Sequence, residues 1–289
     1  MNRHETQAPI DKLPIEILTH VFLVAQEFAG PEYSDKFALS RSLSQVSSHW
    51  RRIAIVTSSL WKHICVKTNQ TDYDYAASLL QRSASHPIYL YLIDDEREVH
   101  DNEDDSDTDS NEEDVILDEL LAFLSEAGSR IYALHLESSE MHFDSALNLL
   151  SFLLDRGCPD AFKQLRINHS GATTPADIWE LDWNDSGTDS PRRCESAMSP
   201  VEVLHLVNVN FLWDSTAYAG LVDLRCLFTV IPTSIEALDF MHALAASPTL
   251  NILKICGLGF ESLDEWDSSI TVHMPCLEVL YLSDLSDTT

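Results

Sequence analysis

The chain has 289 residues, 45% of them hydrophobic, which is enough to bury a sizeable core in one elongated domain or two compact ones. Its formal net charge of -29 repels phosphate backbones and anionic lipid head groups, which argues against binding to nucleic acid or to a membrane surface. No apolar run is long enough to span a bilayer, and the polar residues 1–11 contain no signal-peptide core, so we expect a cytoplasmic or nuclear protein.

Residues 10–66 have the pattern of a compact helical unit. The pair Leu13-Pro14 predicts the start of a first helix, because proline is favoured in the first helical turn. The pair Gly30-Pro31 predicts the end of that helix. The apolar residues between these two signals recur at helical spacing, namely Ile17, Leu18, Val21 and Phe22.

Two further helices are predicted in the same unit. The second contains the apolar residues Phe37, Leu39 and Leu43. Either Ser47 or Ser48 can cap the third helix, because a serine side chain accepts a hydrogen bond from an N–H group of the first turn. The third helix contains Trp50, Ile53 and Ala54, and the pair Leu60-Trp61 closes the unit.

Two polar segments interrupt the rest of the chain. Residues 94–114 contain thirteen carboxylates and one arginine, and this composition predicts a disordered acidic insert. Residues 184–199 are rich in polar residues and predict a second, mobile loop.

Both polar segments contain candidate phosphorylation sites. Ser106 and Ser110 each have an acidic residue three positions later, the pattern that acidophilic kinases use. Ser190 precedes a proline, as at the sites of proline-directed kinases, and Ser186 and Ser190 together match the DSGxxS form of a phosphodegron.

The pattern apolar-x-x-Leu-x-apolar recurs through residues 72–289. Its central residues are Leu134, Leu165, Leu204, Leu224, Leu253 and Leu280, and a degenerate copy lies at Leu90-Leu92. Apolar-periodic stretches between the copies predict helices at 115–127, 144–154 and 234–246. A strand followed by a helix, repeated in this way, predicts a stacked solenoid with a short-stranded parallel sheet on its inner side.

The repeats are similar to leucine-rich repeats, although their spacing is irregular and asparagine is absent from the ninth position. An ordinary α/β domain whose buried strands contain Leu-x-Leu is the alternative. The last copy lies close to Thr289 with no capping unit after it, so we expect either a longer chain or a cover over that repeat.

The segments IDKLPIEILTHVF, SLSQVSSHWRRIA and LWKHICV, in this order, resemble the F-box in the form common among fungal proteins. The resemblance covers residues 10–66 and departs from the family pattern in a longer connection between the first two helices, roughly residues 27–37. It implies docking onto a Skp-type adaptor, and through the adaptor onto a cullin-based ubiquitin ligase. The expected fold is therefore α/β, an N-terminal helical F-box followed by an irregular leucine-rich-repeat solenoid.

A three-helix unit of this size contains more large apolar side chains than its own core needs, and the surplus predicts an interface. By resemblance, Leu13-Pro14 and the first helix contact the adaptor, while Val46, Trp50 and Ile53 shape the packing beside them. The candidate adaptor-binding residues are Leu13, Pro14, Ile15, Ile17, Leu18, Val21, Phe22, Val46, Trp50 and Ile53. The alternative is that these residues form the core of an N-terminal cap on the repeats.

The fifth position of each repeat lies between two buried positions and must therefore point outward from the sheet. The residues at this position are His135, Arg166, His205, Arg225, Lys254 and Tyr281. Five of the six are basic or imidazole side chains, in a strongly acidic chain. We therefore predict that this face binds an acidic or phosphorylated segment of a protein substrate, or the acidic insert 94–114 of the chain itself. The alternative is the general preference of exposed strand positions for long polar side chains.

The sequence contains no Gly-rich phosphate loop, no H-E-x-x-H or G-x-S-x-G motif, and no C-x-x-C pair among its six cysteines. It therefore predicts no catalytic residue, no metal and no cofactor. The function that follows is a non-catalytic, substrate-recruiting subunit of an SCF-type (Skp/cullin/F-box) ubiquitin ligase. The alternative is an adaptor-bound or stand-alone leucine-rich-repeat module that binds proteins without a role in a ligase.

Overall fold

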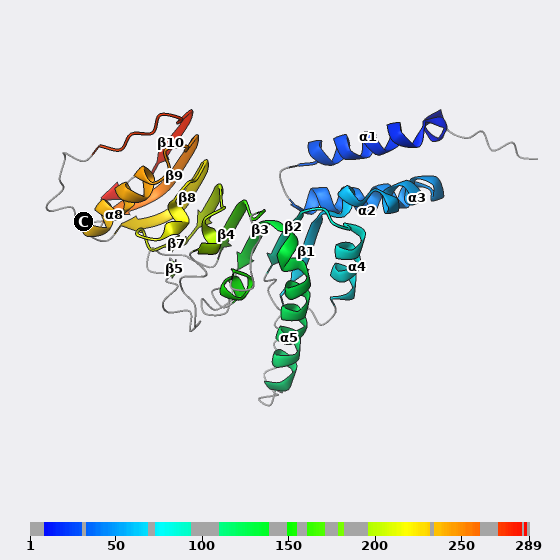
Figure 1. The fold of residues 1–289 in the computed structure, drawn as a ribbon, viewed down its shortest axis with the longest axis horizontal. Helices are drawn as coiled ribbons and strands as arrows, with labels where there is room; N and C mark the ends of the chain where they lie inside the picture. The colour runs from blue at the N-terminus through cyan, green and yellow to red at the C-terminus, as the bar shows by residue number, and fades with distance from the viewer. Residues whose placement is uncertain are drawn as a thin grey trace, which may run out of the picture.

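The computed structural model describes residues 9–30, 33–68, 73–93, 110–138, 149–154, 161–170, 179–181, 196–231, 234–260, 271–284 and 286–287. The fold is mixed α/β, with three N-terminal helices beside one end of a long parallel sheet (Figure 1). None of the helices within these ranges combines the length and apolar character that crossing a membrane requires.

The N-terminal helices follow a short 3-10 turn, η1 (Pro9–Lys12), and are α1 (Ile15–Phe28), α2 (Tyr33–Val46) and α3 (Ser48–Val56). Ser47 is the residue that caps α3, because its hydroxyl accepts a hydrogen bond of 3.2 Å from the backbone N–H of Trp50. Only residues 29–32 separate α1 from α2. The long connection expected at residues 27–37 is therefore wrong, because both helices extend into that segment.

A buried polar network joins α1, α2 and the 3-10 turn η2 (Ser58–Trp61). The side-chain amide of Gln26 donates to the hydroxyl of Ser40 at 3.0 Å and to the carbonyl of Leu60 at 2.9 Å. The hydroxyl of Ser40 also lies 2.9 Å from the carbonyl of Leu60. These contacts satisfy polar groups that the apolar core around them cannot.

The main sheet contains nine strands, and successive strands of the sheet pair in parallel. In order across the sheet they are β1 (His63–Lys67), β2 (Ile88–Ile93), β3 (Ile131–Ser138), β4 (Gln164–His169), β6 (Val203–Val207), β8 (Asp223–Ile231), β9 (Ile252–Phe260) and β10 (Val279–Ser283), with β11 (Ser286–Asp287) also paired to β9. The strands β5 (Trp179–Leu181) and β7 (Val209–Phe211) form a separate parallel pair. Figure 1 shows the strands of the main sheet following one another in chain order, away from α1–α3.

Helices lie between the strands, as the alternating pattern predicted. They are α4 (Asp74–Arg82), α5 (Ser110–Ala127) and α8 (Ser234–Ala245), with short 3-10 turns η3 (Gly128–Arg130) and η5 (Thr216–Tyr218). Residues 149–154 are also helical.

The predicted central leucines pair in register across the sheet. The series runs Leu90, Leu134, Leu165, Leu204, Leu224, Leu253 and Leu280, each opposite the next. All but Leu280 are buried, and together with the apolar residues on either side they form the core of the sheet. Strand β1 adds Ile64, which pairs with Leu90 and which the repeat pattern did not include.

A column of left-handed backbone positions accompanies the last four repeats. Asn208, Phe228, Gly257 and Asp284 have φ angles of 54°, 56°, 67° and 53°, and each lies four residues after the central leucine of its repeat. After each of them the chain forms a second short stretch of strand, namely β7, the last residues of β8 and β9, and β11. The left-handed residue thus allows each strand to change direction at the same place.

The acidic insert differs from the prediction at its C-terminal end. Helix α5 begins at Ser110, so residues 110–114 are helical rather than disordered. The physical reason is that an acidic run is stabilised at the start of a helix, where the partial charge is positive. Residues 94–109, with Ser106, lie outside the described residues, as do residues 184–195 of the second polar loop, with Ser186 and Ser190. Residues 196–198 of that loop form a helical turn.

Candidate functional site

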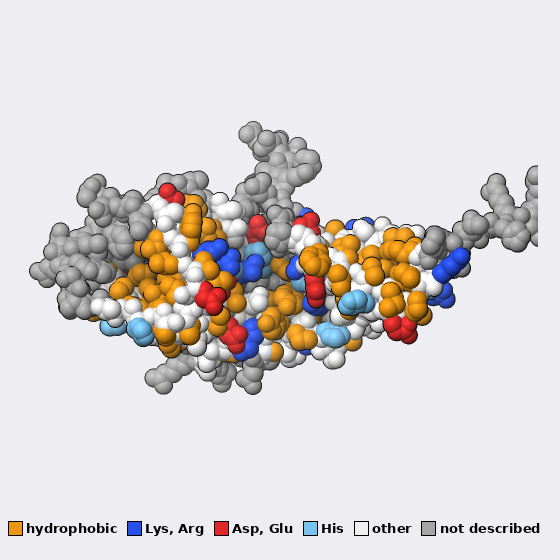
Figure 2. Space-filling view, turned by 90° about the horizontal axis from the view of Figure 1, so that it is seen from above, with side chains coloured by type: hydrophobic (Ala, Val, Ile, Leu, Met, Phe, Trp, Pro, Cys, Tyr) orange, Lys and Arg blue, Asp and Glu red, His pale blue; other side chains and the backbone are white. Residues whose placement is uncertain are grey.

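The outer side of α1 is the first candidate surface. Helix α1 contains two pairs of apolar residues, Leu18 with Phe22 and Ile17 with Val21. The members of each pair are four positions apart and lie on the same side of the helix, while the two pairs lie on different sides. Leu18 and Phe22 are fully buried in the core, while Ile17 and Val21 are 49% and 42% exposed. We define the α1 face by its exposed residues Leu13, Pro14, Ile15, Ile17 and Val21. Figure 2 shows hydrophobic side chains gathered at the end of the molecule that contains α1–α3.

The ten predicted adaptor-binding residues therefore divide into exposed and buried ones. Leu18 and Phe22 lie in the core and present no surface to a partner, which corrects their assignment as contact residues. Ile53 is also buried, so its part at the adaptor site is limited to the packing beneath the exposed residues. Trp50 is half-buried, with its ring 4.9 Å from the ring of Phe22, and Val46 is exposed. These residues are apolar, and their spacing placed them on helices. Spacing alone does not show which of two apolar sides of a helix faces the core.

Further exposed apolar residues in these helices were not predicted. Phe28, the last residue of α1, is 86% exposed. It follows Ile17, Val21 and Val24 at spacings of four, three and four residues, so the helical period of the α1 face could have identified it. The other exposed apolar residues of this region are Ile10, Ile55 and Val56.

The outward side of the sheet is the second candidate surface. The register places the predicted fifth-position residues side by side, and we call them the fifth-position row: His135, Arg166, His205, Arg225, Lys254 and Tyr281. Tyr91 of β2 extends the row by one strand. Figure 2 shows Lys and Arg side chains near the middle of this side of the molecule, with Asp and Glu side chains beside them.

Asp223 reduces the positive charge of the row. Its carboxylate accepts hydrogen bonds of 2.9 and 2.7 Å from the guanidinium of Arg225, and its Oδ2 lies 3.3 Å from Nε2 of His205. Burial raises the pKa of the Asp223 carboxyl, but His205 and Arg225 outweigh burial and bring the pKa to about 2. The carboxylate is therefore ionised at neutral pH and offsets the charge of Arg225.

The two histidines of the row add little positive charge at neutral pH. Burial lowers the pKa of His135 to about 4, and the nearby Arg166 adds to this effect. Burial also lowers the pKa of His205, although Asp223 opposes it. The row is therefore less basic than the sequence suggested, and Arg166 and Lys254 are its cations that form no ion pair among the described residues.

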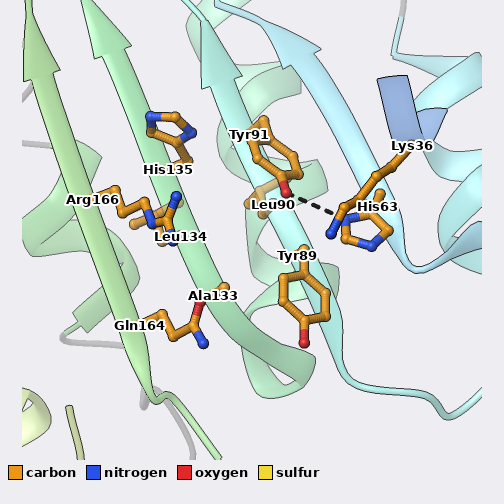
Figure 3. A pocket seen from close by; sticks show the side chains of 10 residues that line it. All are labelled: Lys36, His63, Tyr89, Leu90, Tyr91, Ala133, Leu134, His135, Gln164 and Arg166. Atoms are coloured by element: carbon orange, nitrogen blue, oxygen red, sulfur yellow. Dashed lines mark hydrogen bonds between the residues drawn. The ribbon is translucent and has the colours of Figure 1, made fainter. Parts of the chain in front are cut away.

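A hollow of about 110 Å3 opens where α2 meets the row, and we call it the junction pocket (Figure 3). Its polar lining comes from five elements: Lys36 of α2, His63 of β1, Tyr89 and Tyr91 of β2, His135 of β3, and Gln164 and Arg166 of β4. The small side chain of Ala133 lies between Tyr89 and Gln164 in the strand register, and this leaves the space open. The pocket could not be predicted from the sequence, because α2 and β4 are far apart in the chain.

Aromatic contacts hold one wall of the junction pocket in place. The ring of His63 stacks on Tyr89 with centroids 4.6 Å apart, and its Nδ1 makes a hydrogen bond of 3.2 Å with the hydroxyl of Tyr91. Burial lowers the pKa of His63 to about 3, with Lys36 and Lys62 contributing, and burial raises the pKa of Tyr91 to about 12. At neutral pH the pocket therefore presents uncharged imidazole and phenol groups between its two cations.

No group of three or more His, Cys, Asp or Glu side chains within the described ranges is placed to hold a metal ion.

Comparison with known protein families finds a match for the N-terminal part of the chain. A family model described as F-box-like matches residues 10–67, which contain α1, α2, α3, η2 and β1. The match therefore extends from the α1 face to the first strand of the sheet. No curated protein matches the chain.

Proposed function

We propose that this protein, whose residues 10–67 form an F-box-like domain, is a substrate-recruiting subunit of an SCF-type ubiquitin ligase. F-box domains bind Skp-type adaptors, and the adaptor would connect the protein to a cullin. The protein itself would perform no chemistry. Its contribution would be proximity, because one end docks on the adaptor while the other holds a target near the ubiquitin-charged enzyme.

The observation that carries this proposal is the exposure of the α1 face within the F-box-like domain. Leu13, Ile15, Ile17 and Val21 keep large apolar surfaces in water although Leu18 and Phe22 of the same helix are buried. Exposed apolar side chains that gather on one face are typical of protein–protein interfaces. We infer that the adaptor covers this face, with Val46 beside it and Trp50 supporting it from behind.

We propose that the strands and helices after β1 form an irregular leucine-rich-repeat solenoid that binds the substrate. The in-register leucines and the left-handed residue repeated at one position both favour this interpretation. The fifth-position row is the substrate surface in this proposal, with Arg166 and Lys254 as the cations that no described carboxylate pairs with. An acidic or phosphorylated segment is the ligand that their charge favours.

Binding to a purified Skp-type adaptor tests the first half of the proposal. The variants Ile17→Asp and Val21→Asp place a charge in the α1 face, and we expect each to weaken adaptor binding by at least about tenfold, as for a hot-spot residue. Val222→Asp is the matched control, because Val222 is also exposed but lies before β8, outside the F-box-like domain. The affinity can be measured by calorimetry with all variants checked for native circular dichroism.

The outcomes separate the proposed function from its alternative. Equal binding by the wild type and both α1 variants would contradict the α1 face as the adaptor site. Adaptor binding without co-purification of a cullin would instead indicate an adaptor-bound interaction module outside a ligase.

A further inference from the structure

We propose that the junction pocket binds the phosphate group of a phosphoserine or phosphothreonine side chain in a protein substrate. This inference rests on the proposed function, because it assigns the substrate's anchor within the surface that receives the substrate. It adds a residue of the F-box-like domain, Lys36, to a substrate site otherwise built by the sheet.

The charges of the pocket favour an anion. Among the residues that the structure describes, its lining contains Lys36 and Arg166 but no Asp or Glu, in a chain whose net charge is -29. In the part of the chain that the structure describes, the ion pairs involve other residues, so neither cation is neutralised by a carboxylate there. An anion that enters the pocket therefore meets a cation on each of two sides.

The arrangement of donors suits a tetrahedral phosphate. Figure 3 shows Lys36 and Arg166 on opposite sides of the pocket, with Tyr89 and Tyr91 between them and Gln164 below Arg166. A guanidinium offers paired N–H donors, an ammonium offers three, and the side-chain amide of Gln164 and the phenol of Tyr89 offer more. A phosphate has three oxygens that accept such bonds and a charge close to -2, so it can use donors from several directions.

The size of the pocket favours a single group of a larger ligand. Its volume of about 110 Å3 is well below the roughly 300–1,000 Å3 of sites that enclose a complete small molecule. The pocket adjoins the fifth-position row, because His135 and Arg166 belong to both the pocket and the row. A peptide lying along the row could therefore place one phosphorylated side chain in the pocket while the rest of the peptide contacts the neighbouring strands.

The same residues would place the anchored substrate close to the ligase machinery. Lys36 belongs to α2 of the F-box-like domain, and Arg166 belongs to β4 of the sheet. A phosphate held between them lies where the F-box-like domain meets the sheet. Phosphorylation would in this way both select the substrate and fix its position along the sheet.

Fluorescence polarisation with the full chain tests this inference. The probe is a labelled glycine-rich peptide with a single phosphoserine, and the comparison peptides carry serine or glutamate at that position. The variants Lys36→Gln and Arg166→Gln remove one cation each, and Ala133→Leu fills the pocket without a change of charge. Arg52→Gln is the control, because Arg52 is an exposed residue of α3 that belongs neither to the lining of the pocket nor to the fifth-position row.

The phosphoserine peptide is expected to bind at least about tenfold more tightly than either comparison peptide. Each of the three pocket variants should lose about tenfold or more in affinity, while Arg52→Gln should keep it. Equal binding of the serine or glutamate peptide would overturn the inference, as would unchanged affinity in the pocket variants. Tighter binding of inorganic phosphate than of the phosphopeptide would also overturn it, because the pocket would then be a site for free phosphate.

Adaptor binding by the same variants separates this inference from the proposed function. Pocket variants that bind the adaptor normally but not the phosphopeptide support both. A wild-type protein that binds the adaptor but no phosphopeptide overturns this inference alone. A wild-type protein that binds no adaptor contradicts the proposed function, whatever the phosphopeptide does.

Discussion

Gly257 in β9 has a left-handed backbone with φ of 67° and lies against Phe228 of the neighbouring strand. A Cβ added at Gly257 would lie 2.8 Å from Cδ1 of Phe228, closer than real contacts allow. We therefore expect Gly257→Ala to destabilise the protein by about 1–3 kcal/mol, through backbone strain and displacement of the Phe228 ring. The change is measured as the shift in the free energy of unfolding by urea.

Gly128 supplies the control for this prediction. It lies in η3, its φ is not left-handed, and a Cβ there would meet no atom within 4 Å. Gly128→Ala should be neutral or stabilise the protein by up to about 1 kcal/mol. Equal losses in the two variants would mean that the left-handed column does not constrain β9.

Gln26 is a second residue whose contribution to stability can be traced to particular contacts, the two hydrogen bonds of its side chain. Its side-chain amide donates to Ser40 and to the carbonyl of Leu60, and it is buried. Gln26→Leu should lower the free energy of unfolding by about 1–3 kcal/mol, because it removes both bonds from a site shaped for an amide. Gln45→Leu, at an exposed position of α2, should change it by less than about 0.5 kcal/mol. Similar effects of the two substitutions in urea titrations would contradict a role for the network.

At the scale of elements, the sequence predicted the sheet well because each strand repeats one short pattern. Leu134, Leu165 and Leu204 are buried and in register, as expected for the fourth position of a repeat. The same logic placed the fifth-position residues outward. The left-handed column was not predicted, because Asn208, Phe228 and Asp284 share no residue type and only their backbone conformation repeats.

The candidate sites were less predictable because they depend on contacts between distant elements. Residue type did not distinguish the buried Leu18 from the exposed Ile17 on the same helix. The charge of the fifth-position row depends on Asp223, which belongs to a different position of the repeat. The junction pocket depends on the meeting of Lys36 with Arg166, which no local pattern contains.

The first strands of the sheet should make stability depend on pH through two histidines. The pKa of His63 is lowered to about 3 and that of His135 to about 4, each mainly by burial. Below the ordinary pKa of about 6.5, the unfolded chain binds protons that these folded histidines do not. Stability should therefore fall as the pH decreases from about 6.5, at up to roughly 1.4 kcal/mol per unit for each histidine.

Urea titrations between neutral pH and the ordinary carboxylate range test this dependence. Asp223 does not contribute there, because its lowered pKa of about 2 makes its stabilisation decline only under more acidic conditions. His63→Gln should flatten the decline, whereas the same substitution at the exposed His242 should leave it unchanged. A decline of equal slope in all three proteins would show that other groups cause it.

At the scale of the whole molecule, the F-box-like domain and the sheet share one strand and one core. The family match ends at residue 67, within β1, and every residue of β1 pairs with β2. One continuous cluster of buried residues extends from Leu18 to Leu258. The boundary predicted between residues 66 and 72 therefore separates two sequence patterns, while the packing continues across it.

A pair of fragments can show how much the sheet depends on β1. Removal of residues 1–72 deletes β1 and leaves the apolar strand β2 as an uncovered sheet edge, which is a template for aggregation. Fragment 58–289 keeps η2 and β1, and thus the partner of β2. We expect fragment 73–289 to aggregate on size-exclusion chromatography and to unfold at a lower temperature than fragment 58–289. If both fragments are monomeric with the same unfolding temperature, the sheet is self-sufficient from β2 onward, and Lys36 and Arg166 then belong to two separately folding units.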